Sequence, residues 1–99
     1  MAIVEVTITP LGTATPSVSY YVAEVHKVLE KENFKYQLTP MGTVIEGELD
    51  EILSVIRKMH EVPFQKGALR VSTTIKIDDR RDKKASIEQK IRSVEEKLK

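Results

Sequence analysis

Alternating apolar and polar residues mark two stretches, one near each end of the chain. Between Ala2 and Pro10, and again from Leu69 to Ile77, apolar or β-branched residues alternate with polar ones. A period of two is typical of a strand that has one face in a core and one polar face. Both stretches therefore predict half-buried β-strands.

A period close to 3.6 follows the first of these stretches. Six apolar residues recur there at the spacing of one helix face: Val18, Tyr21, Val22, Val25, Val28 and Leu29. This stripe predicts an amphipathic helix. The helix begins in one of two ways, either with Thr15 as the cap and Pro16 at the first helical position, or with Ser17 as the cap.

A second helix is predicted from Leu49 onward. Asp50 is the expected N-cap, and Pro63 is expected to stop the helix. Its apolar face consists of Ile52, Val55, Ile56 and Met59.

The segment between the two helices predicts a β-hairpin. Pro40 favours an extended conformation at Thr39, and Gly42 supplies the positive φ that a tight reversal often needs. Strand-forming residues flank this turn at 36–38 and 43–45. The sequence therefore predicts two antiparallel strands joined by the turn Thr39–Thr43.

Glu46 is an unusual residue for the second strand of this hairpin. Carboxylates are not favoured in strands and are rarely buried without a partner. We expect Glu46 either to face water or to meet a cation or a hydrogen-bond donor.

The order of elements is strand, helix, strand, strand, helix, strand, which is the ferredoxin-like α+β arrangement. Right-handed crossovers make the first strand run parallel to the second, and the third parallel to the fourth. We expect one domain over residues 1–99, with both helices on one face of a four-stranded antiparallel sheet. The other face is polar and suited to contact with another sheet; it carries Glu5, Thr7, Thr9, Arg70, Ser72, Thr74 and Lys76.

The C-terminal segment predicts a third helix, at about residues 86–98. It follows a connector of mixed charge, Asp78–Lys84, and Ser86 and Gln89 form a capping box. Its narrow apolar stripe consists of Ile87, Ile91, Val94 and Leu98. Such a stripe resembles a coiled-coil seam, so the helix docks either on its own domain or on a second subunit.

Composition narrows the class of protein. The 99 residues are 40% hydrophobic and 31% charged, with a net charge of +1, which gives no bias toward nucleic acid or membrane. The absence of cysteine excludes disulfides and thiolate metal sites and suits a reducing compartment. The first residues lack the pattern of a signal peptide, and no apolar run is long enough to span a bilayer. We expect a soluble, cytoplasmic protein.

No familiar catalytic or metal-binding pattern is present. His26 and His60 lie on different predicted helices without paired ligand spacing, so each is expected to be structural or at the surface. The glycines are single turn residues rather than a phosphate-binding loop. The sequence therefore predicts neither an enzyme nor a metal or cofactor site.

The predicted topology brings three loops to one end of the sheet. They collect hydroxyl, thioether and aromatic side chains, which together suit a small-ligand site: Ser17, Ser19, Thr39, Met41, Thr43 and Phe64. Glu46 lies slightly further along its strand. The alternative is that these hydroxyls only satisfy backbone groups of the loops.

Several segments together resemble the small thiamine-binding-protein family of archaea, bacteria and yeast. The resemblance covers nearly the whole chain and is carried by the helix start Ser17–Val22, the motif Thr39–Gly47 and the strand Arg70–Arg80. It implies a ferredoxin-like subunit, homotetramers formed through paired sheets and, for some members, binding of thiamine or its pyrimidine part without catalysis.

Two functions follow as hypotheses. The first is a carrier or sensor of a thiamine-like ligand, in which Glu46 meets the amino group or the positive charge and Met41 packs on a ring. In that hypothesis the ring edges are held by the hydroxyls of Ser17, Ser19, Thr39 and Thr43. The second is a homo-oligomeric structural or regulatory module without a physiological ligand. An enzyme or a nucleic-acid binder is disfavoured by the missing base and the balanced charge.

Overall fold

The computed structural model describes residues 1–12, 19–82 and 87–98. The elements are β1 (Ala2–Leu11), α1 (Ser19–Lys31), β2 (Lys35–Thr39), β3 (Gly42–Gly47), α2 (Leu49–Gln65), β4 (Arg70–Asp79) and α3 (Ile87–Leu98). The strands form one sheet in the order β2-β3-β1-β4, and every neighbouring pair is antiparallel. The ferredoxin-like α+β prediction is confirmed. The predicted starts of the first helix, Thr15 and Ser17, lie outside the described residues.

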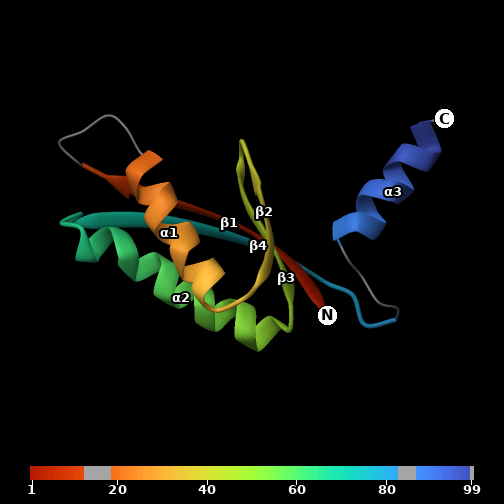
Figure 1. Ribbon diagram of the computed structural model, residues 1–99, viewed down its shortest axis with the longest axis horizontal. Coiled ribbons are helices and arrows are strands. Elements are labelled where there is room, and N and C mark those ends of the chain that lie inside the picture. The colour runs from red at the N-terminus through yellow and green to blue at the C-terminus, as the bar shows by residue number, and fades with distance from the viewer. Residues whose placement is uncertain (13–18, 83–86, 99) are drawn as a thin grey trace.

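The helices α1 and α2 lie on the same side of the sheet (Figure 1). The strand residues beneath them follow the period of two, since Val4 and Val6 of β1 and Ile45 of β3 are buried against the helices. Leu29 of α1 and Met59 of α2 complete the centre of this core. The apolar faces of the strands and of α1 and α2 therefore form a single core between the sheet and these two helices.

The first strand pairs unequally with its two neighbours. It pairs with β4 over its whole length, from Ala2 to Leu11, but with β3 only from Ala2 to Val6. Beyond Val6, the β3 side of β1 has no strand beside it in the described chain, because the β2–β3 hairpin turns back at that point. This gap in the sheet positions the candidate site.

The helix α2 begins at Leu49 as predicted, but its predicted cap and its predicted stop were both wrong. Glu48 is the N-cap residue, with extended backbone angles, and Asp50 lies in the first turn, where the helix dipole favours an acid. Pro63 lies inside the last turn and is buried, and the helix continues to Gln65. A proline there removes only one hydrogen bond to the preceding turn, and its ring contributes to the buried face of α2.

The helix α3 lies away from α1 and α2 (Figure 1) and contacts the sheet through its first turn, at Lys35 and Asp78. None of its residues is buried, and its stripe becomes more exposed along the helix, from Ile91 at 43% through Val94 at 58% to Leu98 at 80%. The prediction of a helix is confirmed, whereas the capping residue Ser86 lies outside the described part of the chain. The far end of the stripe therefore does not pack on the helix's own domain.

No helix in the described ranges is both long enough and apolar enough to cross a membrane.

Candidate functional site

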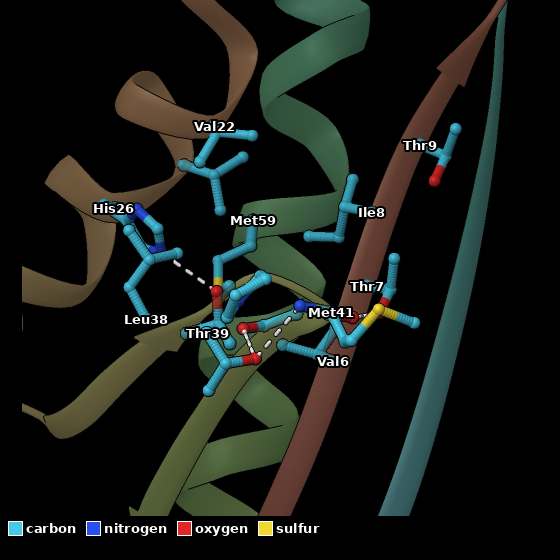
Figure 2. Close-up of a pocket in the computed structure, with 14 residues that line it drawn as sticks. Val6, Thr7, Ile8, Thr9, Val22, His26, Leu38, Thr39, Met41 and Met59 are labelled. Carbon is cyan, nitrogen blue, oxygen red and sulfur yellow. Dashed lines mark hydrogen bonds between the residues drawn. The ribbon is translucent and has the colours of Figure 1, made fainter. Parts of the chain in front are cut away.

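A pocket of about 250 Å³ occupies the gap beside β1 (Figure 2). Its walls come from β1, the β2–β3 hairpin, the inner face of α1 and one residue of α2. The lining residues are Val6, Thr7, Ile8, Thr9, Val22, Val25, His26, Leu38, Thr39, Pro40, Met41, Gly42, Thr43 and Met59. Because this part of β1 is an open edge, residues from both of its faces contribute to one pocket.

The hairpin turn is held against β1 by side-chain hydroxyls. The Thr39 hydroxyl donates to the Gly42 carbonyl (2.8 Å) and accepts from the Met41 amide (3.2 Å). The Thr7 hydroxyl donates to the Met41 carbonyl across 3.1 Å. Gly42 is required here, because its φ is +152° and a Cβ would lie 2.8 Å from the Thr7 hydroxyl. The hydroxyls of Thr7 and Thr39 therefore serve mainly to build the pocket.

The main polar feature of the pocket is the pair formed by His26 and Thr43. The His26 Nε2 lies 2.9 Å from the Thr43 hydroxyl, which is almost completely buried. The imidazole stacks on Tyr36 with ring centres 5.5 Å apart and planes inclined by 11°, and the Tyr36 hydroxyl donates to Glu30. The His26 ring is therefore fixed in orientation from two sides.

Burial lowers the pKa of His26, and the nearby charge of Glu30 opposes this effect. The neutral ring is therefore favoured near pH 7. A neutral imidazole has one donor and one acceptor, and the Thr43 hydroxyl can donate or accept. Together they form a pair that can exchange donor and acceptor roles.

The remaining lining determines what the site can hold. Apolar walls include Val22, Val25 and Met59, and the exposed thioether of Met41 lies at the rim. No carboxylate lines the pocket among the described residues. The site is therefore suited to a flat, uncharged group with a few hydrogen-bonding atoms on its edge.

The structure brings three of the six predicted ligand-binding residues together. Thr39, Met41 and Thr43 all line the pocket. Ser17 lies outside the described residues, and Ser19 is the first residue of α1 but its side chain is also outside them. Phe64, predicted to join the same cluster, packs edge-on against His60 and does not line the pocket.

Glu46 lies on the opposite side of the sheet from the pocket. Successive strand residues point to opposite faces, so Glu46 points away from the side on which Thr43 and Ile45 meet the helices. Its side chain is only 5% exposed, and its Oε2 is 3.5 Å from the Lys35 Nζ. Of the two expectations for Glu46, the structure supports contact with a cation.

His26, which is predicted from the sequence to be structural or at the surface, also lines the pocket. The spacing contained a usable signal, because Val22 and His26 are four residues apart and so lie on one helix face. His60 has a comparable contact elsewhere, between its Nδ1 and the Thr73 hydroxyl at 2.6 Å. No group of three or more acidic or histidine side chains in the described ranges is arranged to hold a metal ion.

Fold and site together define a small ferredoxin-like chain with a candidate pocket for a flat polar ligand. Residues 4–95 match the family described as thiamine-binding protein, and the chain belongs to this family. It is 60% identical to the UPF0045 protein YqgV of Bacillus subtilis, over 99% of this chain and 98% of that protein. The name of this relative does not state an activity.

Solved structures agree with the fold. The hypothetical protein MJ1052 from Methanocaldococcus jannaschii is 40% identical and has a TM-score of 0.86, with 96% of each chain covered. A Thermotoga maritima protein, named as a proposed thiamine biosynthesis/salvage protein, has a TM-score of 0.79 over 94% of this chain and 97% of its own. At 19% identity, this second likeness supports the fold alone.

The depressed pKa of His26 predicts how stability depends on pH. The unfolded chain takes up a proton at a higher pH than the folded chain does, so stability rises with pH across this window. We expect the free energy of unfolding to fall as the pH drops below about 6.5, the ordinary histidine value, and to keep falling until the folded pKa is passed. Denaturant unfolding at a series of pH values measures this change.

The replacement His26→Gln should remove this part of the pH dependence. An NMR titration of the imidazole carbons reads the His26 pKa directly in the folded protein. A ring that titrates at or above about 6.5 would contradict the assignment.

Proposed function

We propose that the chain binds thiamine, or a pyrimidine related to thiamine, without transforming it. The observation that carries this proposal is the pocket beside β1, which combines apolar walls with the hydrogen-bonded pair His26 and Thr43. Membership of a family described as thiamine-binding protein supports the same ligand class. With no cysteine in the chain, we propose that this binding takes place in the reducing cytoplasm.

The size and charge of the pocket favour the pyrimidine half of thiamine. Its volume of about 250 Å³ is below the range of roughly 300–1,000 Å³ for pockets that enclose drug-sized ligands. One aromatic ring with short substituents suits such a volume better than two linked rings. The thiazolium half carries a permanent positive charge, and the lining residues offer no carboxylate to balance it. In this proposal the pyrimidine enters the pocket and the thiazolium stays toward solvent.

The polar side chains then have separate roles. An aminopyrimidine carries a donor next to ring acceptors, and the pair His26 and Thr43 can supply one group of each kind. Met41 is 79% exposed at the rim, so its thioether can fold over a ring face when a ligand is bound. Thr39 holds the hairpin that presents Met41.

Binding without chemistry is the better description of this site. A histidine that contacts a hydroxyl resembles a base beside a nucleophile, but catalysis of that kind also needs a third group to orient the base. His26 is oriented instead by stacking on Tyr36, and no carboxylate among the described residues hydrogen-bonds to its ring. The pocket lining therefore supports a binding role.

Titration calorimetry with thiamine and with its separate halves tests the proposal. We expect 4-amino-5-hydroxymethyl-2-methylpyrimidine to bind about as tightly as thiamine and the thiazole alcohol alone not to bind. Thr43→Val removes one hydroxyl at nearly constant volume and should weaken binding by about 0.5–1.5 kcal/mol. Thr43→Ser keeps the hydroxyl and should bind with nearly normal affinity.

Glu46→Gln is the control on the far side of the sheet, and its affinity should stay within about 0.5 kcal/mol of the wild type. Two results would contradict the proposed site. One is loss of affinity in Glu46→Gln with normal affinity in Thr43→Val, and the other is the absence of binding by thiamine and the pyrimidine alike.

We also propose that the chain assembles with copies of itself, most simply as a tetramer. Ile75 and Ile77 of the edge strand β4 are 41% and 45% exposed, and the apolar stripe of α3 is exposed as well. Exposed apolar side chains on β4 and on α3 favour contact with another chain. A homo-oligomeric structural or regulatory module without a physiological ligand is the second candidate function, and these same surfaces favour it.

Light scattering during size-exclusion chromatography tests the assembly. We expect a mass near four times the 11.2 kDa of one chain at micromolar concentration. A monomer mass at that concentration would contradict the assembly. An oligomer that binds neither thiamine nor the pyrimidine would favour the second candidate function.

A further inference from the structure

One row of four side chains crosses the face of the sheet opposite to α1 and α2. The strand register pairs Lys35 with Glu46, Glu46 with Ile3, and Ile3 with Asp78, so the row runs from β2 through β3 and β1 to β4. Directly opposed residues in a sheet point to the same face. The row therefore has a cation at one end, an anion at the other, and Glu46 and Ile3 between them.

The two central members of this row are buried although they lie on the open face. Ile3 is 9% exposed and the Glu46 side chain 5%, whereas the side chains of Lys35 and Asp78 are 54% and 52% exposed. The Oε2 of Glu46 is fully buried and accepts no hydrogen bond in the described part of the chain. A buried carboxylate oxygen without a donor is costly, so this atom has a strong tendency to recruit one.

The first turn of α3 complements both ends of the row. Glu88 accepts a hydrogen bond from Lys35, with its Oε2 2.6 Å from the Nζ, and Lys90 pairs with Asp78. Each contact joins opposite charges, so the charges of the turn are complementary to those at the two ends of the row. These two ion pairs join the first turn of α3 to the sheet; none of the residues of this helix is fully buried, and Ile87 is half-buried.

Lys35 is shared between two carboxylates. Its Nζ lies 2.6 Å from Glu88 but 3.5 Å from Glu46, which is too far for a hydrogen bond of ordinary strength. If Glu88 moves away, the lysine has only a short distance to close before it satisfies the Glu46 oxygen. Lys35 therefore has two arrangements, one paired with Glu88 and one paired with Glu46, and this is the basis of a two-state element.

We propose that the first turn of α3 is a releasable strap across the open sheet face, and that Glu46 favours its release by competing with Glu88 for Lys35. In the closed state Lys35 and Asp78 hold the strap. In the open state Lys35 turns to Glu46, and the strap leaves the row. Glu46 thus acts on the position of α3 and has no part in the pocket beside β1.

The test uses the absence of cysteine from the chain, which makes introduced cysteines unique labelling sites. Spin labels at Ser93→Cys on α3 and Gln37→Cys on β2 report the distance between the helix and the sheet by pulsed EPR. A large excess of unlabelled protein removes distances between copies. Spectra are recorded at about 0.1 M and about 1 M NaCl, where the screening length falls from roughly 10 Å to 3 Å.

We expect one short distance at the lower salt concentration and an added longer, broader population at the higher one. Glu88→Gln should lower the ratio of closed to open strap by about 1.5-fold to 5-fold, the factor for one exposed ion pair. Glu46→Gln should change the ratio in the opposite direction, toward closed, because Lys35 then loses the competing charge. Glu51→Gln, an exposed glutamate on α2, is the matched control and should leave the ratio unchanged.

The opposite effects of Glu88→Gln and Glu46→Gln separate the strap from a purely structural role of Glu46. If Glu46→Gln fails to fold, as a melting curve would show, Glu46→Asp draws the carboxylate back from Lys35 and should also favour the closed strap. Distances that respond neither to salt nor to Glu88→Gln would overturn the proposal. So would greater opening in a folded Glu46 variant.

Discussion

The unequal pairing of β1 is the constraint on which the candidate site depends. This strand has β4 beside it from Ala2 to Leu11, but β3 only as far as Val6. The β2–β3 hairpin cannot extend further, because Pro40 and Gly42 turn it and the hydroxyls of Thr7 and Thr39 fix that turn. The vacant edge of β1 is closed instead by side chains of α1, and this produces a pocket rather than a filled core.

The period of two in the strands separates two kinds of polar chemistry. On the helix side, Thr43 meets His26 in a neutral hydrogen-bonded pair beside the pocket. On the opposite side, Glu46 lies in a row of charges with Lys35, and α3 continues that row through Glu88. An uncharged hydrogen-bonded pair is suited to a flat ligand, whereas ion pairs are suited to a contact that salt can weaken. A shift of one residue in the register of β3 would move Thr43 and Glu46 each to the opposite face of the sheet.

Much of the fold could be predicted from the sequence, because local periodicity and turn residues determine it. The period of two in β1 and β4, the stripe of α1 and the turn at Pro40 and Gly42 are all properties of neighbouring residues. The start of α2 at Leu49 was predicted correctly, whereas Asp50 is not its cap and Pro63 does not stop it, since a proline is tolerated where its ring can be buried.

The candidate site was predicted less well, because it depends on register. The predicted convergence of loops grouped Thr39, Met41 and Thr43, and these residues, all close to the turn, line the pocket. The sequence did not predict which face of the sheet Glu46 lies on, because Val44 and Ile45 are both apolar and either one could point into the core. The length of pairing between β1 and β3 is a tertiary property, so the gap that places His26 in the pocket had no counterpart in local sequence.

Mapping a ligand by NMR tests the central claim most directly, namely that the gap beside β1 is the binding site. The experiment follows backbone amide shifts while 4-amino-5-hydroxymethyl-2-methylpyrimidine is added to the labelled protein. If the gap binds the ring, the largest changes fall at 7–9 on β1, 22–26 on α1 and 38–43 at the hairpin. Changes gathered instead around Lys35, Glu46 and α3, or none at saturating pyrimidine, would contradict it.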